Sequence, residues 1–187
     1  MMRVTVFGGS QPRAGDLAYT QAIYLGQLLG SAGYTVLTGG YIGTMEAISR
    51  GAAEFGGYVI GVTCDEIEAW RSVSPNPWVK EEIRYSTIRQ RLFGLIEGCD
   101  AAVALPGGIG TLAEVAEMWS HLQTGAISAR PLILVGNEWR IVMDSYFTVL
   151  GNYILEKYRQ ILTFAPDADA VFSMLQTYED NFREKAV

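Results

Sequence analysis

The stretch AAVALPGGIGTLAEVAEMW, residues 101–119, constrains the fold more than any other part of the chain. A run of small apolar residues ends at Pro106, and three glycines and a threonine follow within five residues. The residues after them have the periodicity of a helix. A short apolar run bounded by Pro and Gly predicts a buried strand, and a loop that leads directly into a helix is typical of parallel α/β sheets. Glu114 lies in the first turns of this predicted helix. Its carboxylate is therefore a candidate for chemistry beside the glycine loop.

Similar apolar runs alternate with segments of helical length along the whole chain. The strand-like runs are 3–8, 34–40, 57–63, 101–108, 131–136 and a final short run, 160–164. Helical segments such as 16–33 and 44–56 lie between them, and an amphipathic helix is predicted from about 168 to 182. Strands that alternate with helices form parallel sheets that are covered on both faces. We therefore expect one domain over residues 1–187, with a Rossmann-like three-layer α/β/α fold and a mainly parallel sheet.

Composition and charge exclude several classes of function. Of the 187 residues, 49% are hydrophobic and 18% are charged, as expected of a globular protein. The net charge of −6 leaves no basic stripe for a nucleic-acid partner. Residues 1–9 lack a signal-peptide pattern and no long apolar run is present, so we expect a cytoplasmic protein with no membrane partner. Cys64 and Cys99 end apolar segments and are expected to be reduced core thiols.

Glycines cluster at the ends of three predicted strands. The clusters are Gly8 and Gly9 after the first strand, Gly39, Gly40 and Gly43 after the second, and Gly107, Gly108 and Gly110 after the fourth. The carboxyl ends of parallel strands meet at one edge of a sheet, where ligands bind. One such cluster is explained by a tight turn, whereas three at one edge favour a ligand crevice.

The loop PGGIGT predicts a phosphate as the ligand. Its backbone N–H groups lie at a helix start without side chains to cover them, and Thr111 adds a hydroxyl. The P-loop pattern fails, because no lysine follows a glycine loop. The dinucleotide pattern is incomplete as well, since Thr38 stands where its first glycine belongs. Asp65 lies about where an acidic ribose ligand is sought, so a dinucleotide stays an alternative.

Periodicity places Glu114 away from the core face of its own helix. That face is predicted to be Leu112, Val115, Ala116 and Trp119. Glu114 then either lies on the surface, where the helix dipole favours it, or faces a ligand or partner subunit. On the preceding helix, TIRQ (87–90) matches a capping box, and Arg89 and Arg91 flank its apolar face on opposite sides. The pattern alone does not choose between these two arginines.

The residues LPGGIGTLAEVAEMW, preceded by RQRL, resemble the LOG ("lonely guy") family, whose hallmark is PGGxGTxxE with an arginine on the preceding helix. The similarity extends to FGGS (7–10), TGGYIGTMEA (38–47) and ARPLILVG (129–136). It implies a phosphoribohydrolase that cleaves the N-glycosidic bond of AMP or cytokinin nucleotides without a metal or other cofactor. By position, it implies that Glu114 and Arg91 are catalytic. The phosphate and nucleotide site would comprise Gly107, Gly108, Gly110, Thr111, Gly9, Ser10, Gly40 and Gly43. A homodimer or higher homo-oligomer is implied too.

One residue departs from the hydrolase pattern. Arg91 is followed by Leu92, whereas the phosphoribohydrolases carry Arg-Lys. Arg-Leu and MEAISRGA (45–52) resemble a related branch that includes molybdenum cofactor carrier proteins. The alternative is therefore a non-catalytic carrier of a phosphate-bearing cofactor.

Two other activities are disfavoured, and one segment has an open role. A pyridoxal phosphate lysine decarboxylase needs a Schiff-base lysine, and Lys80, Lys157 and Lys185 all lie away from the glycine loops. His121 is the only histidine, so its stripe with Glu114 and Glu117 is better explained as a polar face than as a metal site.

The segment 64–85 is long for a connection. Either it covers the ligand and selects the base, or it is a surface excursion or subunit contact.

Overall fold

A seven-stranded parallel sheet organises the chain in this computed structural model, which describes residues 2–185 apart from the side chains of 182, 183 and 185. The strands lie in the order β4-β3-β2-β1-β5-β6-β7. Their bounds are Arg3–Phe7 (β1), Thr35–Thr38 (β2), Tyr58–Cys64 (β3), Glu81–Tyr85 (β4), Ala101–Ala104 (β5), Leu132–Val135 (β6) and Leu162–Ala165 (β7). The strand order reverses between β1 and β5, and a ligand crevice is expected where their connections diverge.

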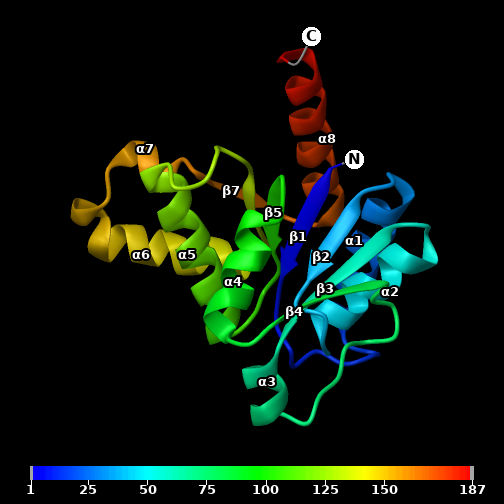
Figure 1. Cartoon of the computed structure of the whole chain (residues 1–187). Helices are drawn as coiled ribbons and strands as arrows, with labels where there is room; N and C mark the ends of the chain where they lie inside the picture. Colours follow the sequence, from blue (N-terminus) through cyan, green and yellow to red (C-terminus); the bar gives the residue numbers. More distant parts are fainter. Residues whose placement is uncertain (1, 186–187) are drawn as a thin grey trace.

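Helices cover both faces of the sheet, as Figure 1 shows. The helix bounds are Leu17–Ser31 (α1), Thr44–Glu54 (α2), Asp65–Trp70 (α3), Ile88–Glu97 (α4), Ile109–Thr124 (α5), Asn137–Leu150 (α6), Glu156–Arg159 (α7) and Ala168–Lys185 (α8), with a 3₁₀ turn at Gly151–Tyr153. Helices α1, α2 and α8 pack on one face, and α4, α5 and α6 pack on the other. The predicted three-layer α/β/α fold is therefore confirmed.

Burial explains why the central strands are easily recognised in the sequence. All four residues of β5 and of β6 are buried, so these strands read as continuous apolar runs. Cys64 and Cys99 are buried and unbridged, as expected of core thiols. Among residues 2–185, no helix is long and apolar enough to cross a bilayer.

The segment 64–85 is not one long loop, which corrects the interpretation from the sequence. It holds the helix α3 and the edge strand β4, joined by residues 71–80. Strand β4 pairs in parallel with β3, but its sequence is EEIRY and none of its residues is buried. A charged edge strand lacks the apolar run that marks a buried strand, and such charge protects sheet edges from pairing with other chains. The hydrophobic pattern therefore could not reveal it.

Candidate functional site

A cavity of about 350 Å³ lies at the carboxyl edge of the sheet. It brings together the loop after β1, the loop after β2, α3, α4 and the start of α5. Among the residues proposed from the sequence, those that line it are Gly9, Ser10, Arg91, Gly108, Gly110, Thr111 and Glu114. This volume is in the usual range for a small-molecule site.

The glycine loop leaves backbone amides open at the start of α5. Apart from the chain neighbours and the backbone of α5 itself, no atom lies within 4 Å of where a Cβ would stand on Gly108 or Gly110. No side chain caps α5 within the described part of the chain, so its first amides are free for a ligand. The Thr111 side chain is buried beside them and lines the cavity. This geometry suits an anion, because the amides and the helix dipole both favour negative charge.

Gly107 is not among the residues that line the cavity, and its backbone makes a close contact with the loop after β1. A Cβ on Gly107 would collide with the Thr111 hydroxyl and would stand 2.9 Å from the backbone nitrogen of Gly9. Gly9 in turn donates its N–H to the carbonyl of Pro106 at 3.3 Å. The loops after β1 and β5 therefore touch through glycine backbone. The Nε1 of Trp139 donates to the carbonyl of Leu105 at 3.1 Å and holds the loop after β5 from behind.

Gly40 and Gly43 also lie outside the cavity lining. Both have φ of +78°, a backbone conformation that favours glycine. A Cβ on Gly43 would stand 2.5 Å from the carbonyl oxygen of Gly9 and 2.6 Å from Cα of Ser10. Thr44 donates both its N–H and its hydroxyl to the same Gly9 carbonyl, at 2.9 and 3.0 Å. The loop after β2 thus supports the loop after β1, and Gly43 permits their close approach, whereas Gly40 faces Thr63 and Gly61 on β3.

Glu114 and Arg91 meet inside the cavity. The Nη1 of Arg91 lies 3.8 Å from Oε1 of Glu114, and the two side chains are only 9% and 13% exposed. The Nε of Arg91 donates to the carbonyl of Val62 at 2.7 Å, which fixes the guanidinium to β3. Arg89, by contrast, is exposed and stacks on Phe93. The structure therefore distinguishes two arginines that periodicity left equivalent.

Burial dominates the ionisation of Glu114. It raises the pKa of the Glu114 carboxyl to about 7, and the nearby Arg91 guanidinium opposes that rise. The attraction of Arg91 alone would favour the ionised carboxylate of Glu114, but desolvation outweighs that attraction. A carboxyl with a pKa near neutrality can both accept and release a proton under physiological conditions.

The helix α5 turns a different face to the sheet than its periodicity predicts. The residues buried on it are Thr111, Val115 and Met118, while Leu112 is 41% exposed and Ala116 is exposed. The core face predicted from the sequence was therefore wrong in Leu112 and Ala116. Helix α5 is apolar around more than one face, so the spacing alone does not identify the face that packs. Trp119 is half-buried and donates from Nε1 to the carbonyl of Tyr158 at 2.7 Å, as expected of an anchor.

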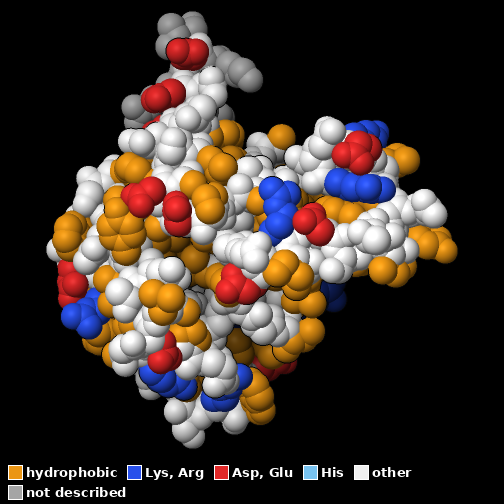
Figure 2. All heavy atoms as spheres, turned by 180° about the vertical axis from the view of Figure 1, so that it is seen from behind, with side chains coloured by type: hydrophobic (Ala, Val, Ile, Leu, Met, Phe, Trp, Pro, Cys, Tyr) orange, Lys and Arg blue, Asp and Glu red, His pale blue; other side chains and the backbone are white. Residues whose placement is uncertain are grey.

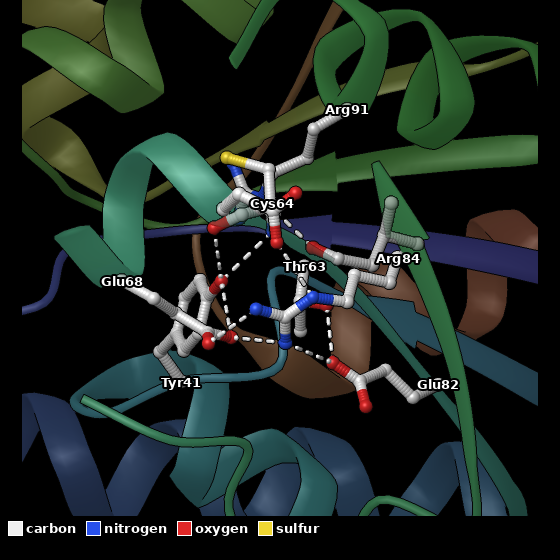
Figure 3. A network of polar contacts seen from close by, with 9 residues as sticks. Tyr41, Thr63, Cys64, Glu68, Glu82, Arg84 and Arg91 are labelled. Carbon is white, nitrogen blue, oxygen red and sulfur yellow. Dashed lines mark hydrogen bonds and ion pairs between the residues drawn. The ribbon is translucent and has the colours of Figure 1, made fainter. Parts of the chain in front are cut away.

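The wall opposite the glycine loop is held by a polar network, drawn in Figure 3. Arg84 on β4 pairs with Asp65 and Glu68 on α3, each at 2.7 Å. The hydroxyl of Tyr41 accepts from the N–H of Cys64 at 2.9 Å, and the Arg91 guanidinium lies over the Tyr41 ring at 5.8 Å. Helix α3 has no buried residue, so these contacts fix it beside the cavity.

Several lining residues were not named as site residues from the sequence. They are Tyr41, Ile42, Met45, Ile67, Trp70, Arg71, Val73, Ile88, Leu92, Ile109 and Ala113, besides Gly8. Tyr41 directly follows the glycines of the second loop, which is the signal that could have indicated it. Trp70 and Arg71 lie in the segment 64–85, for which covering the ligand was one alternative. Nothing in the sequence singled out these two residues, because the position of α3 depends on the unrecognised strand β4.

The sequence of this chain is similar to those of several known proteins. A family model described as "Possible lysine decarboxylase" matches residues 45–175. A probable cytokinin riboside 5'-monophosphate phosphoribohydrolase of Oryza sativa subsp. japonica, LOGL5, is 31% identical over 94% of this chain and 72% of its own length. The cytokinin riboside 5'-monophosphate phosphoribohydrolase LOG2 of Arabidopsis thaliana is 30% identical over 99% of this chain and 89% of its own.

A solved structure shares the fold over nearly the whole chain. The molybdenum cofactor binding protein of Rippkaea orientalis superposes with a TM-score of 0.74 at 22% identity, covering 95% of this chain and 96% of that one. The family model spans more than half of the chain, and the relatives match it from end to end. The chain therefore belongs to the LOG family, to which its PGGxGTxxE loop and its parallel sheet both point.

Proposed function

We propose that this protein hydrolyses the N-glycosidic bond of a nucleoside 5'-monophosphate, AMP or a cytokinin-type nucleotide, to the free base and ribose 5-phosphate. The observation that carries the proposal is the buried Glu114 carboxyl, paired with Arg91 in the cavity where the amides of Gly108 and Gly110 stand open. The same activity is named in the relatives of about 30% identity.

The proposed reaction needs one carboxylate and a bound phosphate. The bond between C1′ and the base nitrogen breaks, and its electron pair leaves with the base. A water oxygen then bonds to C1′ and gives a proton to Glu114, and Glu114 passes that proton to the departing base, so that the base leaves neutral and the carboxylate is restored. The ionised carboxylate also stabilises the positive charge that develops on the sugar. Arg91 positions Glu114 and limits the rise of its pKa.

The phosphate supplies binding energy at a distance from the reacting carbon. Gly108, Gly110 and Thr111 would hold it at the start of α5, with Gly9 and Ser10 facing them from the loop after β1. Fixing the phosphate places the sugar against Glu114, so this energy serves to orient the reacting bond.

Product analysis tests the proposal directly. The purified protein is incubated with AMP and with other nucleoside monophosphates, and free base and ribose 5-phosphate are measured. We expect equal amounts of adenine and ribose 5-phosphate from AMP, and none from adenosine, which lacks the phosphate. Absence of base release from every nucleotide in the panel would overturn the hydrolase.

The second candidate is a non-catalytic carrier of a phosphate-bearing cofactor such as molybdenum cofactor. It is favoured by Leu92, which lines the cavity where hydrolases of the family carry a lysine. An apolar side chain there offers no second cation to a reacting nucleotide. Tight binding of a phosphate-bearing pterin without hydrolysis of any nucleotide would support the carrier.

Lysine decarboxylation, which the description of the family model names, has no support in the cavity. A pyridoxal phosphate enzyme forms a Schiff base with a lysine. No lysine is among the described residues that line this cavity.

We also propose a homodimer formed through α5 and α6. These helices expose large apolar side chains, and Leu112, Ile141, Val142 and Val149 are between 41% and 75% exposed. Figure 2 shows apolar side chains on the lobe that contains α6, at the right of that view. Burying such a face against a second copy removes apolar area from water. Light scattering on the purified chain is expected to give about twice its mass of 20.5 kDa, and a monomer at micromolar concentration would contradict the proposal.

A further inference from the structure

Three charged side chains line the cavity, and two of them already face each other. Arg91 and Glu114 lie 3.8 Å apart, and Arg91 also donates to the carbonyl of Val62. The third is Arg71, which follows α3 directly. Within residues 2–185 no carboxylate lies within ion-pair distance of Arg71. Its positive charge is therefore available to a ligand.

Arg71 reaches across the cavity to the loop after β1. Its Nη1 donates to the hydroxyl oxygen of Ser10 at 2.9 Å, and its guanidinium stacks on the Trp70 ring at 4.1 Å. Gly9, the neighbour of Ser10, bonds through its N–H to the carbonyl of Pro106. The guanidinium therefore lies beside the place where the two glycine loops meet.

The position of Arg71 is set by the contacts of α3. The N–H of Arg71 donates to the carbonyl of Ile67 at 2.8 Å and continues the last turn of the helix. Arg84 anchors that helix through Asp65 and Glu68, and Figure 3 labels the contact with Glu68. The N–H of Ile88 donates to Glu66 at 2.8 Å. The guanidinium of Arg71 is thus held at the cavity by the helix α3, which is itself fixed by these contacts.

We propose that Arg71 binds the phosphate monoester of the ligand directly, as the cationic partner of the backbone amides at Gly108 and Gly110. This inference rests on the proposed function for the location of the phosphate. A doubly charged phosphate on uncharged amides keeps most of its charge unbalanced, and a guanidinium forms charge-assisted bonds with its oxygens. The Ser10 hydroxyl holds Arg71 in position when no ligand is bound. When the ligand binds, its phosphate oxygens accept hydrogen bonds from the guanidinium N–H groups of Arg71.

Binding measurements on matched variants test the assignment. Dissociation constants for AMP, ribose 5-phosphate and adenosine are measured by calorimetry, with Glu114→Gln in every variant so that no ligand is consumed. Arg71→Gln is expected to weaken AMP and ribose 5-phosphate by about 10- to 100-fold and to leave adenosine unchanged. Arg71→Lys is expected to recover part of the loss, because it keeps the charge without the planar fork. Arg89→Gln removes the same charge from an exposed site outside the cavity and serves as the control.

The possible results distinguish a failure of the Arg71 assignment from a failure of the proposed hydrolase activity. An equal loss for AMP and adenosine, or no loss for either, would show that Arg71 only shapes the cavity. A parent protein that binds neither phosphate-bearing probe would overturn the assignment too. If a phosphate-bearing pterin or AMP binds in an Arg71-dependent manner and wild type releases no base, the hydrolase fails and the phosphate assignment stands.

Discussion

Replacing Glu114 by Gln is expected to lower the rate of base release from AMP by about 1,000-fold, while AMP still binds. The amide has nearly the shape of the carboxyl group but neither carries the negative charge nor accepts a proton from water. Loss of a positioned acid–base group typically costs 10²- to 10⁴-fold. Because the phosphate contacts proposed at the start of α5 do not involve Glu114, we expect kcat to fall and the dissociation constant of AMP to change little. Rapid-quench assays of adenine release, with calorimetry of AMP binding, measure the two quantities.

Glu117 provides the matched control for this change. It lies three residues later on α5, and its side chain is 40% exposed and pairs with His121 at 3.3 Å, outside the cavity. Glu117→Gln is expected to retain activity within a few-fold. Comparable losses in the two variants would mean that α5 responds to any lost carboxylate, and Glu114 would then have no special role.

The pH dependence of the wild type gives a second readout of the same group. The pKa of Glu114 is raised by burial to about 7, so its reactive carboxylate form is gained as the pH rises through that value. We therefore expect kcat/KM to increase from pH 5 to pH 8 and then to level off. Arg91 opposes the rise in the pKa, so Arg91→Gln is expected to move the midpoint to higher pH. A flat profile between pH 5 and 8 would contradict the assignment of Glu114 as the base.

The stability of the protein is linked to this pKa with a definite sign. In the unfolded chain the carboxyl titrates near its ordinary value, whereas the folded chain holds its proton up to about pH 7. Between these values the folded state binds more protons, so Glu114 makes the free energy of unfolding fall as the pH rises. The ionised form of Glu114, which is the form proposed as the base, is therefore also the form that destabilises the fold.

The parts of the molecule that could be predicted from the sequence are those with a local physical signature. Fully buried strands such as β5 and β6 must be apolar throughout, and the loop 106–111 must be free of side chains where its backbone faces a ligand or another loop. The capping interaction of α4 was equally local. The N–H of Gln90 donates to the Thr87 hydroxyl oxygen at 3.2 Å, as the TIRQ pattern predicts.

The parts that could not be predicted depend on contacts between distant segments. Arg89 and Arg91 are equivalent on a helical wheel, and only the packing of α4 against β3 buries Arg91. Arg71 reaches the cavity because α3 is held by Arg84 on a strand whose charged sequence resembles a loop. The role of Gly43 likewise follows from the approach of the loop after β1, 33 residues or more away in the sequence. Side-chain roles that rest on such approaches carry no periodic signal.

Replacing Gly51 by Ala is expected to lower the free energy of unfolding by about 3 kcal/mol. Gly51 lies in the middle of α2, where exchange of glycine for alanine ordinarily stabilises a helix by about 1 kcal/mol. Here a methyl group would collide with the carbonyl oxygen of Ile23 on α1 and would stand 3.0 Å from the nitrogen of Gln27. These are backbone atoms, so no side chain can move aside. The two helices would have to separate, and overpacking of this kind costs about 1–3 kcal/mol or more.

The contact between α1 and α2 is reciprocal, which is why we expect the cost of Gly51→Ala to exceed the gain in helix propensity. A methyl group on Gly26 of α1 would stand 2.5 Å from the carbonyl oxygen of Ile48, so glycines on both helices allow the backbones to touch. Separating the helices would also loosen the fully buried Ala22 and Ala52. Urea denaturation followed by circular dichroism measures the change. Gly110→Ala is the control, because nothing lies within 4 Å of its added methyl group on α5. Equal or greater stability of Gly51→Ala would mean that α1 and α2 do not pack through bare backbone in solution.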